Sequence, residues 1–547
     1  MSVKETASDV KTKILRAFNK RAVVQAVFIA FLTASILAPL IAIFFNMTGE
    51  GIRATFTSNM FLPALGNSLS TALTATVITV LLAFAASYCT ERMGLRATSL
   101  WSVLFVIPML IPSISHAFGL ITLFGKNGII TNIFHAKSNL YGFWGIVLGS
   151  IMYSFPVAYL MISGILRYEG SMQYKAAKVL GIPAPRRFLA ITLPYLKKTL
   201  ISTFFAVFTM IITDYGVPLT IGGKMSTLST LMYNTAVANA NINVGSVLGV
   251  VLLVPAMIAF IFDLLNPENA QNGFVNEPVE ANANKWLKVA AYAFCVLISI
   301  FILLPVISFC IMSFAEKYPV NMAFTFRHVR DSFTRGAGTF LLNSLLYATL
   351  VAAFGTIVGF LCAYATSRLK GRLGQVLHFI SMISMAIPGI VLGLAYVVLY
   401  HGSAIYGTVI IIVLVNSVHF FSSPYLMIYN ALNKMNSNLE DVGLSLGIPR
   451  WRIILNVIFP TVLMTVLEMF VYYFVNTMMT ISAISFLAPP APRSIALMIN
   501  QFEAQLLMES AAFVSLLILS VNFTLKGALA VIKKMHYKRT LRSMNIS

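Results

Sequence analysis

The chain has 547 residues, of which 58% are apolar and only 10% carry a charge. Water-soluble domains average about 45–50% apolar and about 25% charged residues, so this composition excludes an ordinary soluble fold. The net charge of +21 would suit a protein that binds nucleic acid. The basic residues, however, gather in and beside the short polar segments between long apolar ones, and this placement argues against nucleic acid as a partner.

Twelve mainly apolar segments follow one another along the chain. Each has about 20 residues or more, which is enough for a helix that crosses a hydrocarbon layer about 30 Å thick. The sequence therefore predicts an all-α membrane protein with about twelve transmembrane helices in the lipid bilayer. The predicted spans are 22–45, 61–89, 99–124, 141–166, 196–218, 244–266, 286–314, 340–367, 374–400, 404–432, 461–487 and 504–532.

The basic residues predict the orientation of these spans. If the N-terminus is cytoplasmic, 29 of the 38 Lys and Arg residues lie in or beside the segments on that side, which is the bias expected of cytoplasmic loops. We therefore expect both termini in the cytoplasm. The loop 315–339 fits less well, because it carries four basic residues and would lie outside. The first apolar segment is too long for the core of a secretory signal, so it predicts a membrane helix.

The sequence contains an internal repeat. Asn67-Ser68-Leu69 recurs 276 residues later as Asn343-Ser344-Leu345, and Tyr159-Leu160-Met161-Ile162 recurs 266 residues later as Tyr425-Leu426-Met427-Ile428. A change of ten residues in one loop accounts for the two offsets, since loops tolerate insertions. The repeat predicts two similar halves of six spans each.

An even number of spans returns the chain to the side from which it started, so the two six-helix repeats are expected to be parallel. We expect a first half over 1–266 with its core repeat at about 60–266. A polar cytoplasmic linker over 267–285 should connect it to a second half over 286–547, whose core repeat covers about 340–534.

Each half carries the same pattern in its largest loop on the predicted cytoplasmic side. Glycine at positive φ ends a helix, and a proline two residues later suits the first turn of a new one. The pattern therefore predicts two short helices joined by a fixed bend and ended by a second proline. We call 175–194 the first elbow and 441–460 the second elbow. They read Lys175-Ala176-Ala177, Gly181-Ile182-Pro183 and Ile191-Thr192-Leu193-Pro194, and Asp441-Val442-Gly443, Gly447-Ile448-Pro449 and Val457-Ile458-Phe459-Pro460.

This spacing, Ala-Ala-x3-Gly-x9-Ile-x-Leu-Pro, resembles the EAA loop of binding-protein-dependent ABC importer permeases with the type I fold. In that family the short helix before the glycine sits in a groove of a cytoplasmic ATPase, which implies an ATPase-coupling role for both elbows. Lys175 stands where the family usually has Glu, while Asp441, Val442 and Gly443 stand for Glu-Ala-Ala in the second copy. The likeness extends over about 60–505, and the fused form is similar to the ferric iron, thiamine and 2-aminoethylphosphonate permeases, the last above all.

The sequence has no Gly-x4-Gly-Lys-[Ser/Thr] loop to hold nucleotide phosphates. The resemblance accordingly implies a permease subunit in the bacterial cytoplasmic membrane, not an enzyme, with no catalytic residue, cofactor or metal of its own. It implies two copies of a cytoplasmic ABC ATPase, which bind ATP and Mg²⁺, and an extracellular or periplasmic substrate-binding protein.

The cargo is left open by the sequence. A phosphonate such as 2-aminoethylphosphonate, or ferric iron, is the expectation, and thiamine or a polyamine is the alternative. An ion-coupled secondary transporter with parallel repeats is a rival of another class. Such a transporter would need charged groups deep in the membrane, and this sequence has few.

Two short segments are expected near the substrate pathway. Asp214 and Tyr215 belong to a stretch that resembles the Asp-aromatic-Gly segment of this branch, and Thr480 and Ser482 belong to the similar stretch of the second half. For Asp214 the alternative is a packed residue that pairs with polar neighbours. For Glu468, within the eleventh span, we expect a structural ion pair.

Overall fold

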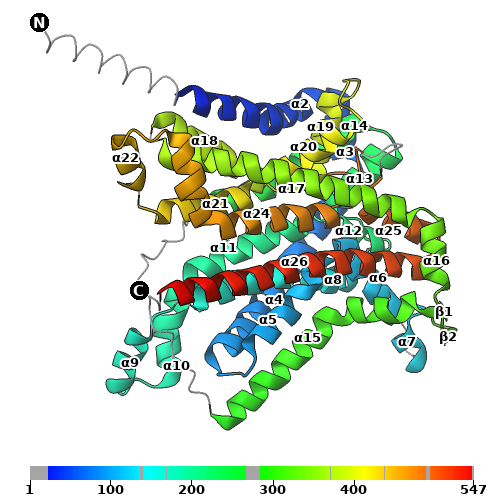
Figure 1. The fold of residues 1–547 in the computed structure, drawn as a ribbon. Helices are drawn as coiled ribbons and strands as arrows, with labels where there is room; N and C mark the ends of the chain where they lie inside the picture. The colour runs from blue at the N-terminus through cyan, green and yellow to red at the C-terminus, as the bar shows by residue number, and fades with distance from the viewer. Residues whose placement is uncertain are drawn as a thin grey trace, which may run out of the picture. The chain divides into compact units, whose positions relative to one another are not determined.

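The computed structural model describes residues 22–135, 139–167, 169–265, 284–369, 371–436, 438–487 and 493–544. Most of the predicted linker 267–285 lies outside the described residues. The described chain is almost entirely helical (Figure 1), which confirms the predicted all-α class.

Nine helices in the described residues are long and apolar enough to cross a membrane, and three further pairs of helices pass the same test as bent spans. Counting each pair as one span gives twelve, at the positions predicted from the sequence. The nine are Ala22–Asn46, Phe61–Arg92, Phe143–Leu166, Ala184–Ile212, Ile242–Phe262, Lys285–Ser313, Ala337–Arg368, Arg450–Met479 and Met508–Arg539. The bent pairs are Thr98–Leu110 with Ser113–Ile133 (98°), Arg372–Ala386 with Gly389–Tyr400 (108°) and Val409–His419 with Ser422–Lys434 (56°).

Two of the three bends have a proline at the break. Pro112 separates the members of the first pair and Pro388 those of the second, 276 residues later. Proline lacks an N–H and clashes with the carbonyl four residues earlier, so a helix cannot run straight through it. The repeat in the sequence thus becomes a repeated bend in the structure.

The described residues form two compact units. One unit groups residues within Met47–Phe340 with Ile495–Ser520. Its elements are α3 (Gly49–Thr57), α4 (Phe61–Arg92), α5 (Thr98–Val106), α6 (Ser113–Phe124), α7 (Ile129–Ile133), α8 (Phe143–Leu166), α9 (Ser171–Val179), α10 (Ala184–Arg187), α11 (Leu193–Ile212), α12 (Gly216–Ile221), α13 (Leu228–Tyr233), α14 (Ile242–Leu265), α15 (Lys285–Ser313), β1 (Ala315–Lys317), β2 (Asn321–Phe324), α16 (Arg327–Thr334) and α25 (Ile495–Ala504).

The other unit groups residues within Met1–Asn46, Leu341–Ser494 and Val521–Ser547. It holds the helix Ala22–Asn46, whose last part is α2 (Ala38–Asn46). Its further elements are α17 (Ala337–Arg368), α18 (Arg372–Ile383), α19 (Gly389–Tyr400), α20 (Val409–His419), α21 (Ser422–Lys434), α22 (Asn438–Ser445), α23 (Arg450–Ile453) and α24 (Phe459–Met479). The last helix, α26 (Met508–Met544), runs through both groups of residues.

Each unit includes the first long helix of the other half of the sequence. In the unit around α4, helix α15 packs on α6, where a Cβ on Gly119 would lie 2.4 Å from the Cα of Pro305. In the unit around α17, Ala22–Asn46 packs on α19, and the Tyr396 hydroxyl donates a hydrogen bond of 2.8 Å to the Ser35 carbonyl. The compact units therefore differ from the two sequence halves in the membership of these helices.

The basic loop 315–339 has a structure of its own. Strands β1 and β2 pair antiparallel and α16 follows them. The backbone N–H of Tyr318 donates to Glu509 Oε1 at 3.1 Å, and its hydroxyl donates to the Thr122 carbonyl. The loop is thereby fastened to two helices of its unit.

Candidate functional site

Both elbows contain the bend that the sequence predicts. Gly181 has φ +70° and Gly447 has φ +73°, a left-handed conformation that glycine adopts without steric cost. Beyond the first glycine, the Ile182 N–H donates to the Ala177 carbonyl at 3.0 Å. The Gly181 N–H donates to the Lys178 carbonyl at 3.1 Å. These are the two hydrogen bonds of a Schellman motif.

The second elbow repeats the motif with the same partners. The Ile448 N–H donates to the Gly443 carbonyl and the Gly447 N–H donates to the Leu444 carbonyl, both at 3.0 Å. Because the first helix of each elbow ends in two defined hydrogen bonds, its direction relative to the next helix is fixed.

The predicted end of the elbow is wrong. The second arm is not a separate short helix that Pro194 or Pro460 closes; it continues into the membrane span as Ala184–Ile212 or Arg450–Met479. A π-helical turn, Phe188–Thr192 or Ile454–Ile458, stands just before each proline. The wider turn accommodates a residue that cannot donate to the carbonyl four residues earlier. Each elbow therefore joins its span without a loop between them.

The first helix of each elbow leaves apolar side chains uncovered. Leu180 is 76% exposed, and Leu446, its equivalent in the second half, is 73% exposed. Val179 and Val442 are also exposed. A cluster of exposed apolar side chains is typical of a surface that binds another molecule.

Most of the predicted coupling residues lie at the surface of their unit, and two are buried. Ala177 is buried, and Gly443 takes its place in the second elbow. A Cβ on Gly443 would lie 2.7 Å from Ile453 Cδ1, so an alanine at this position would crowd Ile453. Exposed are Lys175, Ala176, Gly181, Pro183, Leu193, Pro194, Asp441, Val442, Gly447, Ile448, Pro449, Val457 and Pro460; half-buried are Ile182, Ile191 and Phe459.

A buried ion pair lies at the base of each elbow, and the sequence did not indicate either one. In the first half Arg92, the last residue of α4, pairs with Glu169, which precedes α9. In the second half Arg368, the last residue of α17, pairs with Glu440 on α22, with 3.3 Å between Nε and Oε1. Burial raises the pKa of Glu169, and the charge of Arg92 partly offsets that rise.

The predicted pathway residues lie in turns that follow the spans. Asp214 comes after α11, and its Oδ2 accepts a hydrogen bond of 2.9 Å from the Val217 N–H, while its carbonyl accepts one of 2.7 Å from the Ser229 hydroxyl. Asp214 thus caps the start of α12. Tyr215 is buried and stacks on Tyr233, with 4.9 Å between ring centres. Contact of these residues with a cargo stays a prediction.

Each of the two predicted pathway segments contacts a bent span through one glycine and one serine. A Cβ on Gly216 would lie 2.5 Å from Ser113 Oγ, and a Cβ on Gly389 would lie 2.5 Å from Ser482 Oγ. Ser113 and Gly389 are equivalent in the repeat, as are Gly216 and Ser482. Each half therefore fits one serine and one glycine into the contact, in opposite order. Thr480, the counterpart of Asp214, is buried. It lies just before Ser482 in the sequence.

The remaining titratable residue named from the sequence is paired. Glu468 forms an ion pair with Lys533, as predicted. Within the residues that the structure describes, no group of three or more His, Cys, Asp and Glu side chains is placed to hold a metal ion.

A duplicated bundle of membrane-length helices, with a rigid elbow continuous with a span in each half, defines a polytopic membrane protein built of two similar halves. Residues 83–267 and 355–534, more than half of the chain, match the family described as "Binding-protein-dependent transport system inner membrane component". The chain belongs to this family, with the family domain present twice. It is accordingly a permease of the ABC importer type.

The chain is similar to known transport permeases. The chain is 24% identical to the ferric transport system permease protein FbpB of Actinobacillus pleuropneumoniae, over 86% of this chain and 72% of that protein. It is 24% identical to the thiamine transport system permease protein ThiP of Haemophilus influenzae, over 62% of this chain and 64% of that protein. A chain from the crystal structure of a bacterial alginate ABC transporter with its periplasmic protein superposes with a TM-score of 0.39, at 15% identity, and covers 49% of this chain.

Proposed function

We propose that this chain is the permease subunit of an ATP-driven importer and that each elbow docks on one copy of a cytoplasmic ABC ATPase. The observation that carries the proposal is the repeated Schellman bend, which in both halves ends a helix with uncovered apolar side chains. ATP and Mg²⁺ would bind to the two ATPase subunits, and this chain would bind neither.

The elbows suit the transmission of force. A displacement of α9 reaches α10 through the fixed bend at Gly181 and then α11 through continuous helix, and the second half offers the same route. ATP binding would draw the two ATPase subunits together and shift the spans toward one side of the membrane, and hydrolysis would reverse the shift. Coupling of this kind needs an element with two positions that both sites bias.

The remaining partners follow from the family. A periplasmic or extracellular binding protein would deliver the cargo, and both termini and both elbows would face the cytoplasm. The basic residues in and beside the predicted cytoplasmic segments support this orientation.

We propose ferric iron as the cargo, because a relative named for ferric transport aligns with 86% of this chain. Thiamine is the second candidate, supported by a relative that aligns with 62%. No comparison supports the phosphonate that the sequence resemblance suggested, and it enters the test as a third cargo.

The test is uptake by proteoliposomes that contain this chain, with and without its ATPase and binding protein. We expect uptake of ferric iron only when ATP, the ATPase and the binding protein are all present. Uptake of thiamine or 2-aminoethylphosphonate instead would replace the proposed cargo. Uptake driven by an ion gradient without the ATPase would overturn the proposed function.

A matched pair of substitutions tests the role of the elbows in the same assay. Leu180→Asp together with Leu446→Asp should abolish ATP-driven uptake, because a charge would replace the apolar side chain that each elbow presents to its ATPase subunit. Val320→Asp is the control: Val320 is equally exposed, at 81%, but lies in the β1–β2 turn. It should leave uptake unchanged.

A further inference from the structure

We propose that Arg92 and Arg368 are positioning residues that fasten each elbow to the second long helix of its own half, so that α4 and α17 move with the elbows. The inference rests on the proposed coupling function and extends it. The elbow would then act on two helices at once: on the span that continues it and on the span to which the arginine ties it.

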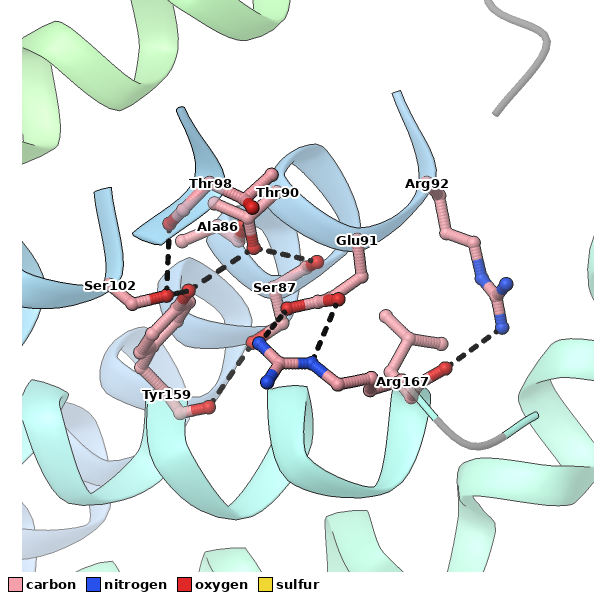
Figure 2. Close-up of polar contacts among 10 residues, drawn as sticks. Ala86, Ser87, Thr90, Glu91, Arg92, Thr98, Ser102, Tyr159 and Arg167 are labelled. Atoms are coloured by element: carbon pink, nitrogen blue, oxygen red, sulfur yellow. Dashed lines mark hydrogen bonds and ion pairs between the residues drawn. The ribbon is translucent and has the colours of Figure 1, made fainter. Parts of the chain in front are cut away.

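In the first half one side chain joins three elements. Arg92 ends α4, and its side chain is only 6% exposed. Its Nη2 donates to the Leu166 carbonyl at the end of α8, at 2.9 Å (Figure 2). The same nitrogen pairs with the buried carboxylate of Glu169. The guanidinium carbon lies 6.0 Å from the ring centre of Tyr174, on α9.

The second half has the same arrangement. Arg368 ends α17, and its Nη2 donates to the Leu432 carbonyl at 2.6 Å and to the Met435 carbonyl at 3.2 Å. Its Nε lies 3.3 Å from Oε1 of Glu440 on α22. The other oxygen of Glu440 accepts a hydrogen bond of 3.1 Å from the Tyr364 hydroxyl. The arginine again joins three elements: the end of α17, the end of α21 and the elbow helix α22.

The positions of the carboxylates show that duplication of the sequence does not by itself account for the ion pair in both halves. The two arginines are equivalent at the offset of 276, and the carbonyls of Leu166 and Leu432 at the offset of 266. The carboxylates are not equivalent: Tyr174 stands at the counterpart of Glu440, and Met435 at the counterpart of Glu169. Each half therefore supplies an acid from a different position of the repeat to the equivalent arginine.

Stability alone does not explain such a pair. Two charges lose their hydration when they are buried, and replacement by apolar residues of similar volume is often neutral or stabilising. An arginine that also binds backbone carbonyls at the end of a helix fixes direction, because its planar group has donors at set angles. The two pairs are therefore placed to hold geometry where the elbow meets the bundle.

A neighbouring ion pair provides the control. Arg167 donates to Glu91 at 2.9 Å, and the pair bridges the ends of α4 and α8 beside Arg92 (Figure 2). Its Arg167 side chain is 56% exposed, and exposed pairs contribute little. Both pairs join the same two helix ends, and Arg92 also reaches the elbow helix, where its guanidinium lies over the ring of Tyr174.

The test uses the full complex with its ATPase and binding protein in proteoliposomes. The double substitutions Arg92→Met with Glu169→Gln, and Arg368→Met with Glu440→Gln, remove each pair without leaving a buried charge. Each should leave assembly and basal ATP hydrolysis unchanged and lower binding-protein-stimulated uptake by about tenfold, a usual size for coupling between sites. Arg167→Gln should leave uptake within about twofold of the wild type. Wild-type uptake in both double variants would overturn the proposal.

A distance measurement separates fastening from mere stability. Spin labels at Lys178, on α9, and Arg96, just after α4, are introduced after replacement of the four native cysteines. In the wild type this distance should stay constant between nucleotide-free and ATP-bound states, and in the Arg92→Met, Glu169→Gln variant it should change with nucleotide. A distance that stays constant in the variant as well would contradict the proposal.

Failure of the underlying function would look different. If the wild-type chain binds no ATPase, the proposed function fails before any variant is compared. If the first double variant does not assemble, the second-half double variant still decides the matter, because it tests the fastening independently. Uptake lowered about tenfold in an assembled second-half variant supports the proposal, and wild-type uptake in that variant contradicts it.

Discussion

The first and second elbows share a backbone and differ in charge. Both end their first helix at a glycine near φ +70° with the same two hydrogen bonds, and both expose a leucine at the equivalent position. Lys175 in the first elbow, however, corresponds to Asp441 in the second. If both elbows bind copies of one ATPase, the features common to both, bend and apolar surface, are the ones that the binding requires. The differing charges can only adjust its strength.

The largest expected effect comes from breaking the shared bend. Gly181→Val or Gly447→Val places a β-branched residue in the left-handed region, at a cost of about 1–2 kcal/mol or more. A Cβ at either position meets no atom within 4 Å, so the effect is confined to the backbone. We expect stimulated ATP hydrolysis to fall at least tenfold.

The control for this prediction is asparagine at the same positions. Asparagine tolerates the left-handed conformation better than other side chains, so Gly181→Asn should retain most of the stimulated hydrolysis. Equal losses with valine and asparagine would show that the conformation of the bend is not what matters.

The exposed leucine of each elbow can be tested separately. Leu180→Asp and Leu446→Asp, each alone, should weaken ATPase binding by similar amounts, about 1–3 kcal/mol, because each removes one apolar side chain that the bound ATPase would cover. Titration of the ATPase against the chain in nanodiscs measures both affinities. A large effect in one elbow and none in the other would break the proposed equivalence.

Charge should matter less. Lys175→Glu gives the first elbow the acid that the second has as Asp441, and should change the ATPase affinity by no more than about 1 kcal/mol, since exposed ion pairs are weak. The change should shrink as salt is raised, because screening acts on exposed charges. Titrations at low and high ionic strength measure it, and a large effect that is independent of salt would indicate a buried contact instead.

The smallest effect concerns a difference between the halves away from the elbows. Glu503 corresponds to Val237 of the first half, and burial raises the pKa of Glu503 to about 7, against a smaller opposing effect of the Thr220 hydroxyl, 3.4 Å away. A raised pKa in the folded state means that the stability contributed by the protonated carboxyl is present at low pH. It is lost as pH rises from about 4.5 through about 7.

Glu503→Gln removes this dependence. At pH 8 the variant should be more stable than the wild type by on the order of 1 kcal/mol, after allowance for partial exposure, and at pH 4.5 the two should be alike. Thermal unfolding in detergent at both pH values measures the difference. A constant difference at both pH values would contradict a raised pKa.

Local sequence patterns predicted the features that local physics decides. Apolar length located the spans, and Gly181 followed by Pro183 predicted the bend, because few residues adopt that backbone. The same reasoning failed at Pro194, where a π-helical turn lets the helix continue; the proline alone does not indicate whether the helix ends or widens.

Contacts between distant segments could not be read from the repeat. The repeat does not predict the pairing of Arg92 with Glu169, because the partner of Arg368 comes from a different repeat position. The packing of α15 on α6 was equally hidden, since equal halves give no reason for an exchange of first helices. Gly119, which admits Pro305, is a signal that becomes readable only once the neighbour is known.

We propose that the two elbows dock two separate ATPase subunits, and this stoichiometry can be measured. The most direct measurement is the mass of the purified complex by native mass spectrometry, for the wild type, for Leu180→Asp, for Leu446→Asp and for both together. We predict two ATPase copies per chain in the wild type, one in each single variant and none in the double variant. Two ATPase copies retained by the double variant, or a wild-type chain that transports its cargo with no ATPase bound, would contradict the account.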